Sequence, residues 1–573
     1  MNLIQSVEWA VIAPVVAVAV GSLTALLVDL LLPPASRAFP AARRGAVLGG
    51  LAVAAPALAL ALLLPLRAGD RATFCLTVDP APCSYVADRF ALTVQALVLL
   101  GALLAALISL PALTRPDDRP GAVPAGEYVF LLLASATGAA LLPAARDLAT
   151  LILALEVATL PVYALVALRR ADRLAPEAAL KFLLSSVTAT AVTLLGVGFL
   201  YAAAGGLHLT VLADALPDAD PALSGLVTVG AALALVGFAL KVGAVPFHFW
   251  IPDTYGGAPP AIAGYLAVVG KTAGLAGLVL LTTVALPGEH AVWGPALALL
   301  AGLTMTLGNV AALRVDPAAP GSAVRLLAWS SVGQAGWLLV PLAAAGREIG
   351  AGDTGYAGAV SAAVGATLSY ALMYAVVTLG AFAVVLSVRG GRIADHRGMA
   401  ARRRPTALAM AFFLICLAGL PPGLIGLFTK VAVIRSAVDA DLAVLAVVAA
   451  VNVVIALVYY LRWIAVLFRP VGEESAAGVP VAGAPATVAE PTPVGGGAVR
   501  PAGAADVPAT GAPGEGVGPE DAPSDDTSGV LPAAARPVGA LPLSVAVGLA
   551  AGIALVLSGW PQIILRLASG TFL

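Results

Sequence analysis

Lysine is rare in this sequence, and every lysine lies in an apolar stretch. Four of the 31 basic residues are lysines, and the others are arginines. Arginine essentially never gives up its proton, whereas a lysine removed from water can exchange its proton near neutrality. Lys181, Lys241, Lys271 and Lys430 are therefore predicted to be proton-exchange sites.

One carboxylate, Glu156 in LALEVATLP, lies in the same kind of apolar setting. A carboxylate close to a lysine holds the lysine charged, and moving the carboxylate away lets the proton leave. Charges at this depth are costly and usually face a protein interior or a water-filled cavity. The alternative is a set of static buried ion pairs with a purely structural role, which is less probable for four lysines on four helices.

Two of the lysines lie beside predicted helix breaks. Lys241 precedes Pro246 by five residues, and Pro421 and Pro422 interrupt an apolar run before Lys430. Proline removes a backbone hydrogen bond, and the freed groups need protein or water partners in lipid. Broken helices in two halves of a membrane protein indicate an ion path. His248 follows Lys241 by seven residues, would share its face on a continuing helix, and is a candidate relay group.

The elements that must position these groups are membrane helices. The chain is 60% hydrophobic and 11% charged, and its apolar runs are continuous rather than alternating, so an all-α polytopic membrane protein is expected and a membrane barrel is not. We expect helices throughout and no cleaved leader in residues 1–32. About fourteen spans are predicted, centred near Val20, Ala55, Leu100, Ala134, Ala158, Ala191, Leu235, Gly270, Leu300, Gly333, Ala371, Leu420, Ile455 and Leu549.

Arginine placement predicts the orientation, because loops kept in the cytoplasm are enriched in arginine. The loops after odd-numbered spans hold most of the arginines, and those after even-numbered spans hold few, chiefly Arg67, Arg71, Arg146 and Arg347. Odd loops are therefore predicted inside and the N-terminus outside. The odd-loop arginines are Arg37, Arg43, Arg44, Arg115, Arg119, Arg169, Arg170, Arg173, Arg314, Arg389, Arg392, Arg397, Arg402, Arg403, Arg404 and Arg469.

Residues 471–538 are rich in Ala, Pro, Gly and Val and are predicted to be a disordered cytoplasmic linker. Cys75 and Cys83 share one polar loop and could pair if it faces an oxidising compartment, whereas Cys416 is expected to pack in a helix. The sequence carries no metal-ligand spacing or nucleotide-binding motif, so no cofactor is expected on this chain. The net charge of −1 gives no reason to expect a nucleic-acid partner.

The segment PFHFWIPDTYGGAPPAIAGYLAVVGKTAG, residues 246–274, resembles the antiporter-like membrane subunits of respiratory complex I. The D-x-Y-x-G-A-P form at Asp253 to Pro259 favours the subunit N branch over the sister subunits L and M. Further matches are LEVATLPVYALVALRR at 155–170, EAALKFLLSS at 177–186, RLLAWSSVGQAGWLL at 325–339 and AGLPPGLIGLFTK at 418–430. Together they cover roughly residues 126–470.

The resemblance implies fourteen helices with two inverted five-helix repeats and two broken helices. It divides the chain into an N-terminal segment (1–125), two repeats (126–288 and 289–470), the linker (471–538) and a last helix (539–573). Glu156 and Lys181 would form the charge pair of the first half-channel, Lys241 and Lys271 would continue the axis, and Lys430 would be the exit. Gln334 stands where this family often has histidine, and an amide cannot titrate, so water would have to connect Lys271 with Lys430.

The resemblance further implies a proton-translocating, non-redox subunit of an NADH:quinone oxidoreductase in the bacterial cell membrane. Its partners would be other membrane subunits and the lipid bilayer, and the complex would use NADH, FMN, iron-sulfur clusters and a quinone outside this chain. Two rivals remain open: a subunit of a multi-subunit cation/proton antiporter, and a membrane scaffold with no proton path.

Overall fold

A computed structural model describes residues 7–33, 40–76, 82–115, 123–169, 172, 174–351, 356–470 and 540–568. The predicted linker, as well as Arg37, Arg119, Arg170 and Arg173, lies outside the described residues. The helices are α1 (Trp9–Leu31), α2 (Ala41–Leu62), α3 (Arg89–Leu113), α4 (Ala125–Leu141), α5 (Leu148–Ala167), α6 (Leu174–Ala204), α7 (Leu209–Ala215), α8 (Ser224–Val242), α9 (Trp250–Gly257), α10 (Pro260–Tyr265), α11 (Lys271–Val279), α12 (His290–Leu313), α13 (Ser322–Ala351), α14 (Tyr356–Leu386), α15 (Met399–Arg402), α16 (Arg404–Ala418), α17 (Leu424–Asp439), α18 (Ala443–Phe468), α19 (Ala540–Gly559) and α20 (Pro561–Ala568).

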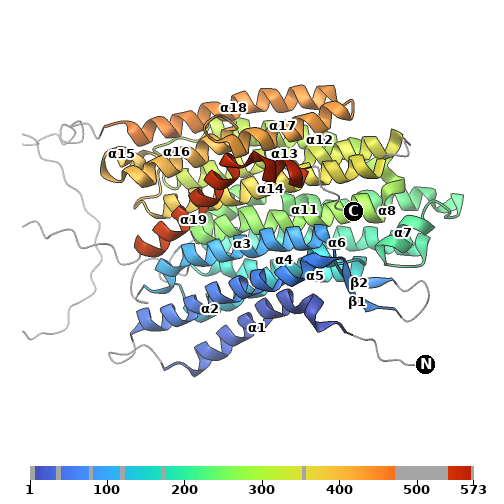
Figure 1. Cartoon of the computed structure of the whole chain (residues 1–573), viewed down its shortest axis with the longest axis horizontal. Coiled ribbons are helices and arrows are strands. Elements are labelled where there is room, and N and C mark those ends of the chain that lie inside the picture. Colours follow the sequence, from blue (N-terminus) through green and yellow to red (C-terminus); the bar gives the residue numbers. More distant parts are fainter. Residues whose placement is uncertain are drawn as a thin grey trace, which may run out of the picture. The chain divides into compact units, whose positions relative to one another are not determined.

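The long helices lie side by side, as the apolar runs predict (Figure 1). Within the described residues, thirteen helical segments are long and apolar enough to cross a membrane. The one remaining predicted span, centred near Leu420, is the pair α16 and α17, which are separated by a short break. The fold class, the number of spans and the two broken helices are therefore confirmed, whereas the relation of the two repeats stays a prediction.

Helices α13 and α14 form the centre of the bundle, and nearly all of their residues in the membrane-spanning stretch are buried. Helix α19 packs across α14 and α3, so the last span closes against the middle of the chain (Figure 1). The segment from α10 to α11 is one continuous span, because the π-helical turn η4 (Leu266–Gly270) joins them. The outer helices, such as α6, keep a broad apolar face exposed, as lipid or a partner subunit requires.

A short hairpin is the exception to the expectation of helices throughout. Strands β1 (Arg71–Cys75) and β2 (Cys83–Ala87) pair in antiparallel register, with Cys75 opposite Cys83, and the two cysteines form a disulfide. Hydrogen bonds hold the hairpin on the helices: the Glu8 amide donates to Thr73, and the Gln95 side chain donates to the Tyr85 hydroxyl. The possible pairing of the two cysteines is confirmed.

Replacing both Cys75 and Cys83 with serine is expected to destabilise the hairpin locally without unfolding the helices. The disulfide closes a loop with a sequence separation of 8 residues. The conformational entropy that this removes from the unfolded loop corresponds to about 2–3 kcal/mol of stability. Hydrogen exchange should therefore accelerate in residues 71–76 and 82–87 of the variant and stay unchanged in α13. Alkylation without reductant provides the chemical check: the buried Cys416 thiol should react only after denaturation, and reaction of Cys75 in the native wild type would contradict the disulfide.

Candidate functional site: buried lysines beside two helix breaks

Three of the four lysines are buried almost completely, on three different helices. The exposed fraction is 4% for Lys241, 1% for Lys271 and 3% for Lys430. None of these three has a carboxylate within ion-pair distance in the part of the chain that the structure describes. The alternative of static buried ion pairs is therefore wrong for these three lysines.

Lys241 lies in the last turn of α8 and points at α6. Its Nζ donates a hydrogen bond to the Ser186 hydroxyl and lies 5.9 Å from the ring centroid of Tyr163 and 5.8 Å from that of Phe182. The ring faces attract a cation. A hydroxyl and two aromatic rings hold the ammonium more weakly than a carboxylate would, so this environment favours the charged form less than an ion pair does.

Lys271 is the first residue of α11 and directly follows the π-helical turn η4. Such turns often mark functional positions, because they displace side chains from the regular helical face. The Lys271 ammonium donates to the Ser331 carbonyl oxygen on α13. It also lies beside Gly243, since a Cβ built on that glycine would be 3.8 Å from Lys271 Nζ.

Lys430 lies on α17, after the second break. Its Nζ donates to the carbonyl oxygens of Leu417 at 2.8 Å and Ala418 at 3.0 Å, which are the last two residues of α16. The same ammonium lies 4.9 Å from the ring centroid of Trp337. Backbone carbonyls that a continuous helix would satisfy are here satisfied by a lysine.

The two helix breaks are built in the same way. Helix α8 ends at Gly243 with φ 81°, and α16 ends at Gly419 with φ 83°, both in the left-handed region that glycine adopts without strain. In each case the residue after the glycine donates back to a carbonyl five residues earlier, from Ala244 to Ala239 and from Leu420 to Ile415. This six-residue loop is the Schellman ending. The predicted breaks are confirmed, and the turn begins at glycine rather than at proline.

Gln334 links the surroundings of Lys430 to those of Lys271. Its side-chain nitrogen donates to the Leu417 carbonyl at 3.3 Å and to the Tyr460 hydroxyl at 3.0 Å, and its oxygen accepts from Tyr370. The Leu417 oxygen is thus shared by Gln334 and Lys430. Because Ser331 lies three residues before Gln334 on α13, the two residues share one helical face. The amide does not titrate, but its hydrogen-bonding groups occupy the region where water was expected to connect Lys271 with Lys430.

Several polar groups near this helical face are buried without a hydrogen-bond partner among the described residues. They include the hydroxyls of Tyr255, Ser331 and Tyr374. Both tyrosine hydroxyls lie close to the Ser331 side chain. Buried polar atoms in proteins are almost always hydrogen-bonded, often to ordered water. The central region around Lys271 is therefore polar enough to bind water.

The expectation that all four lysines are buried is wrong for Lys181. Its side chain is 49% exposed on α6, and it forms ion pairs with Glu177 at 2.7 Å and Asp253 at 2.8 Å. It forms no ion pair with Glu156, so the charge pair implied by the family resemblance is absent from this structure. The reason is the first turn of α9, which brings Asp253 to Lys181.

Glu156 instead lies on the side of α5 that faces α6 and Lys241. Its Oε1 accepts a hydrogen bond of 2.7 Å from the Thr190 hydroxyl. Its charge acts on Lys241, although the two do not come within ion-pair distance. The carboxylate expected to control Lys181 is thus placed to act on Lys241.

His248 does not share a helical face with Lys241, because α8 ends at Gly243 and the intervening residues are not helical. Its ring packs against Trp329 on α13, with the centroids 5.8 Å apart. Its buried Nδ1 has no hydrogen-bond partner among the described residues. The geometric argument for a direct link to Lys241 was therefore wrong, and a role in proton transfer stays a prediction.

Sequence reasoning missed most of the groups that hold the lysines. Ser186 was visible only as part of EAALKFLLSS, and the Leu417 and Ala418 carbonyls carry no signal in a sequence. Asp253 was noted as part of a family motif but not as the partner of Lys181. The only signal available in the sequence was a polar residue on a helix expected to lie next to a lysine. Many residues meet that condition, so it could not single out the true partners.

Comparison with known proteins places the chain in a family. A family profile described as NADH:quinone oxidoreductase/Mrp antiporter, TM matches residues 145–456, more than half of the chain. The NADH-quinone oxidoreductase subunit N 2 of Streptomyces griseus subsp. griseus is 53% identical over 99% of this chain and 94% of its own length. That of Salinispora tropica, named subunit N, is 45% identical over 82% of this chain and 86% of its own length.

A comparison with solved structures agrees with the sequence comparisons. A chain in the structure of respiratory complex I from Thermus thermophilus with bound aureothin superposes with a TM-score of 0.65 at 26% identity, over 97% of this chain and all of that one. The range matched by the family profile, residues 145–456, includes both helix breaks and all four lysines. The chain belongs to the NADH-quinone oxidoreductase subunit N family.

Proposed function

We propose that this chain is the proton-translocating, non-redox subunit N of a bacterial NADH:quinone oxidoreductase. NADH, FMN, iron-sulfur clusters and quinone would react in other subunits, and this chain would move protons in response. The observation that carries the proposal is the set of three buried ammonium groups without a carboxylate partner. Burying a charge without a counter-charge destabilises the folded chain. A function that requires these lysines to release protons would explain why the chain keeps three of them.

The residues divide into an entry, a central line and an exit. Glu156 would act on Lys241, and Lys181 would exchange protons near the surface of the chain, where Asp253 and Glu177 hold it. Lys271 would be the central station, with water bound at the Ser331 and tyrosine hydroxyls, and Lys430 would be the exit station. His248 is assigned a secondary relay role beside the first break.

The two breaks support two repeats, residues 126–288 and 289–470, since the same Schellman ending recurs in both. The Cys75–Cys83 disulfide supports an external position for the loop after α2, because disulfides persist in oxidising compartments. This agrees with the arginine distribution, which puts the N-terminus outside and the arginine-rich loops and the 471–538 linker inside.

The test is Lys271→Met in the assembled complex, measured in membrane vesicles. Methionine keeps the length and removes the exchangeable proton, so NADH-driven proton uptake should fall at least about tenfold, which corresponds to about 1.4 kcal/mol in the barrier. NADH oxidation by an artificial acceptor that takes electrons ahead of quinone should be unchanged. Thr272→Val is the matched control, because the Thr272 hydroxyl donates only to a carbonyl of its own helix.

The same vesicles separate the rivals. Normal proton uptake in the Lys271→Met complex would support a scaffold and overturn the proposal. A multi-subunit antiporter predicts sodium-for-proton exchange in the absence of NADH. The superposition on the Mrp complex from Dietzia sp. DQ12-45-1b, with a TM-score of 0.71 at 20% identity, shows a shared fold and no more.

A further inference from the structure

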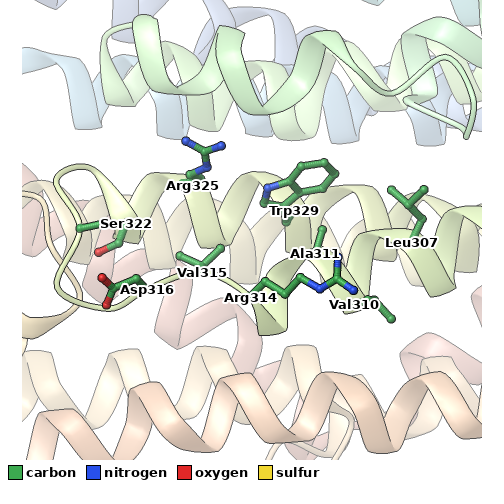
Figure 2. Close-up of a pocket in the computed structure, with 10 residues that line it drawn as sticks. Leu307, Val310, Ala311, Arg314, Val315, Asp316, Ser322, Arg325 and Trp329 are labelled. Atoms are coloured by element: carbon green, nitrogen blue, oxygen red, sulfur yellow. The ribbon is translucent and has the colours of Figure 1, made fainter.

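A second candidate site, which no lysine lines, lies at the end of α12 and the start of α13. A cavity of about 700 Å³ opens there to the surface, in the size range of small-molecule sites. Arg314, Arg325 and Trp329 border it, and Figure 2 shows Arg325 and Trp329 on one helix, with Arg314 on the opposite side of the pocket. None of the groups proposed for proton transfer lines this cavity.

The two arginines have no side-chain partner among the described residues. Neither guanidinium forms an ion pair or a side-chain hydrogen bond within the part of the chain that the structure describes. The one carboxylate at the pocket, Asp316, accepts a hydrogen bond from the Ala318 amide, which holds it in the turn. The pocket therefore carries an excess of positive charge and free planar donors, which suit a phosphate group.

The rest of the pocket is apolar. Leu307, Val310 and Val315 line it, and the exposed leucines of α12 continue away from it along one helical face. Leu299, Leu303 and Leu307 recur every four residues, with exposed fractions of 63%, 47% and 39%. An apolar stripe of this kind accepts an acyl chain that lies parallel to the helix, and the phosphate of the same molecule would then reach Arg314.

We propose that this cavity binds an anionic phospholipid, with the phosphodiester between Arg314 and Arg325 and one acyl chain along α12. The indole of Trp329 lies at the boundary between the charged and apolar parts, where tryptophan is favoured in membrane proteins. Basic pockets between membrane helices on the cytoplasmic side bind anionic headgroups by these means. The arginine distribution places this end of α12 on that side. A free phosphate would use the arginines but leave the apolar stripe unused.

The experiment uses the purified complex in detergent with two photoactivatable lipids of identical tails, one phosphatidylglycerol and one phosphatidylcholine. Peptides from residues 299–329 should be labelled by the anionic lipid and hardly by the neutral one. In Arg314→Gln/Arg325→Gln, the concentration giving half-maximal labelling should rise about thirtyfold, since each arginine contributes about fivefold near an anionic headgroup. Arg347→Gln, an exposed arginine at the other end of α13, is the matched control and should leave labelling unchanged.

Each other result overturns the proposal. Equal labelling of the wild-type complex by both lipids would mean that charge does not select the occupant, and this comparison needs no variant. Loss of labelling on addition of inorganic phosphate would assign the site to a soluble anion. No labelling by either lipid would mean that a neighbouring subunit fills the pocket. Arg314→Lys/Arg325→Lys keeps both charges and loses only the planar donors, so it should be labelled more strongly than the glutamine variant, which separates a failure to fold from a loss of binding.

Discussion

Replacing Lys241 with methionine will decouple the complex. The variant removes the ammonium that Ser186 holds and on which the Glu156 charge acts, so in the proposed path no proton could pass from the Glu156 side to Lys271. NADH-driven proton uptake in vesicles should fall at least about tenfold, while assembly and oxidation of NADH by an early artificial acceptor are retained. Normal coupled turnover in this variant would disprove a path through Lys241.

A pair of neighbouring serines provides the matched controls for this result. Ser186→Ala removes the hydroxyl that accepts from Lys241 and should give a partial loss of proton uptake, because the ammonium remains but is no longer held in place. Ser185→Ala lies beside it on α6, where its hydroxyl donates to the Lys181 carbonyl of its own helix, and should behave as wild type. Equal losses in the two serine variants would indicate a general effect on α6.

The second large effect is expected at Lys430, where two substitutions separate charge from proton release. Lys430→Met removes the exchangeable proton, and Lys430→Arg keeps a positive charge that is never released. Both should lower coupled proton uptake at least about tenfold. If Lys430 served only as a fixed charge, the arginine variant would pump normally, and that result would remove Lys430 from the path.

The free energy of unfolding should change far less than the rate of proton uptake in the Lys430 variants. The methionine variant leaves the Ala418 carbonyl without its lysine donor, which costs about 1–3 kcal/mol for a buried group, but it also removes the cost of burying an ammonium. The two terms have opposite signs, so the thermal midpoint should shift by only a few degrees. Arg435→Met on the same helix is the control, since that side chain is 79% exposed.

The positions of the membrane spans were predictable, because each depends on a local property of the sequence. Continuous apolar runs located the spans, and the prolines near Lys241 and Lys430 indicated the breaks. The hairpin was missed because its strands are short and lie in a polar loop. Its stability comes from Cys75 pairing with Cys83 and from bonds to distant helices, and neither follows from strand propensity.

The environment of each lysine was only partly predictable. Burial of Lys241, Lys271 and Lys430 follows from their apolar neighbours in sequence. Lys181 has similar neighbours but lies on a face of α6 that this chain leaves open, and the first turn of α9 supplies Asp253 from 72 residues away. The partner of a charged side chain depends on how helices pack, so the choice between Glu156 and Asp253 required the three-dimensional structure.

The shared ending of α8 and α16 has a consequence for how the charges are held. The peptide dipoles of a helix add up to a partial negative charge at its C-terminus, and both of these termini lie inside the bundle, one beside Lys271 and one beside Lys430. A dipole of the backbone cannot be protonated, so its attraction for a cation is the same in acid and in alkali. A carboxylate in the same place would weaken as the cytoplasm acidified. The two breaks would thus give the proposed path two permanent negative poles, one beside Lys271 and one beside Lys430.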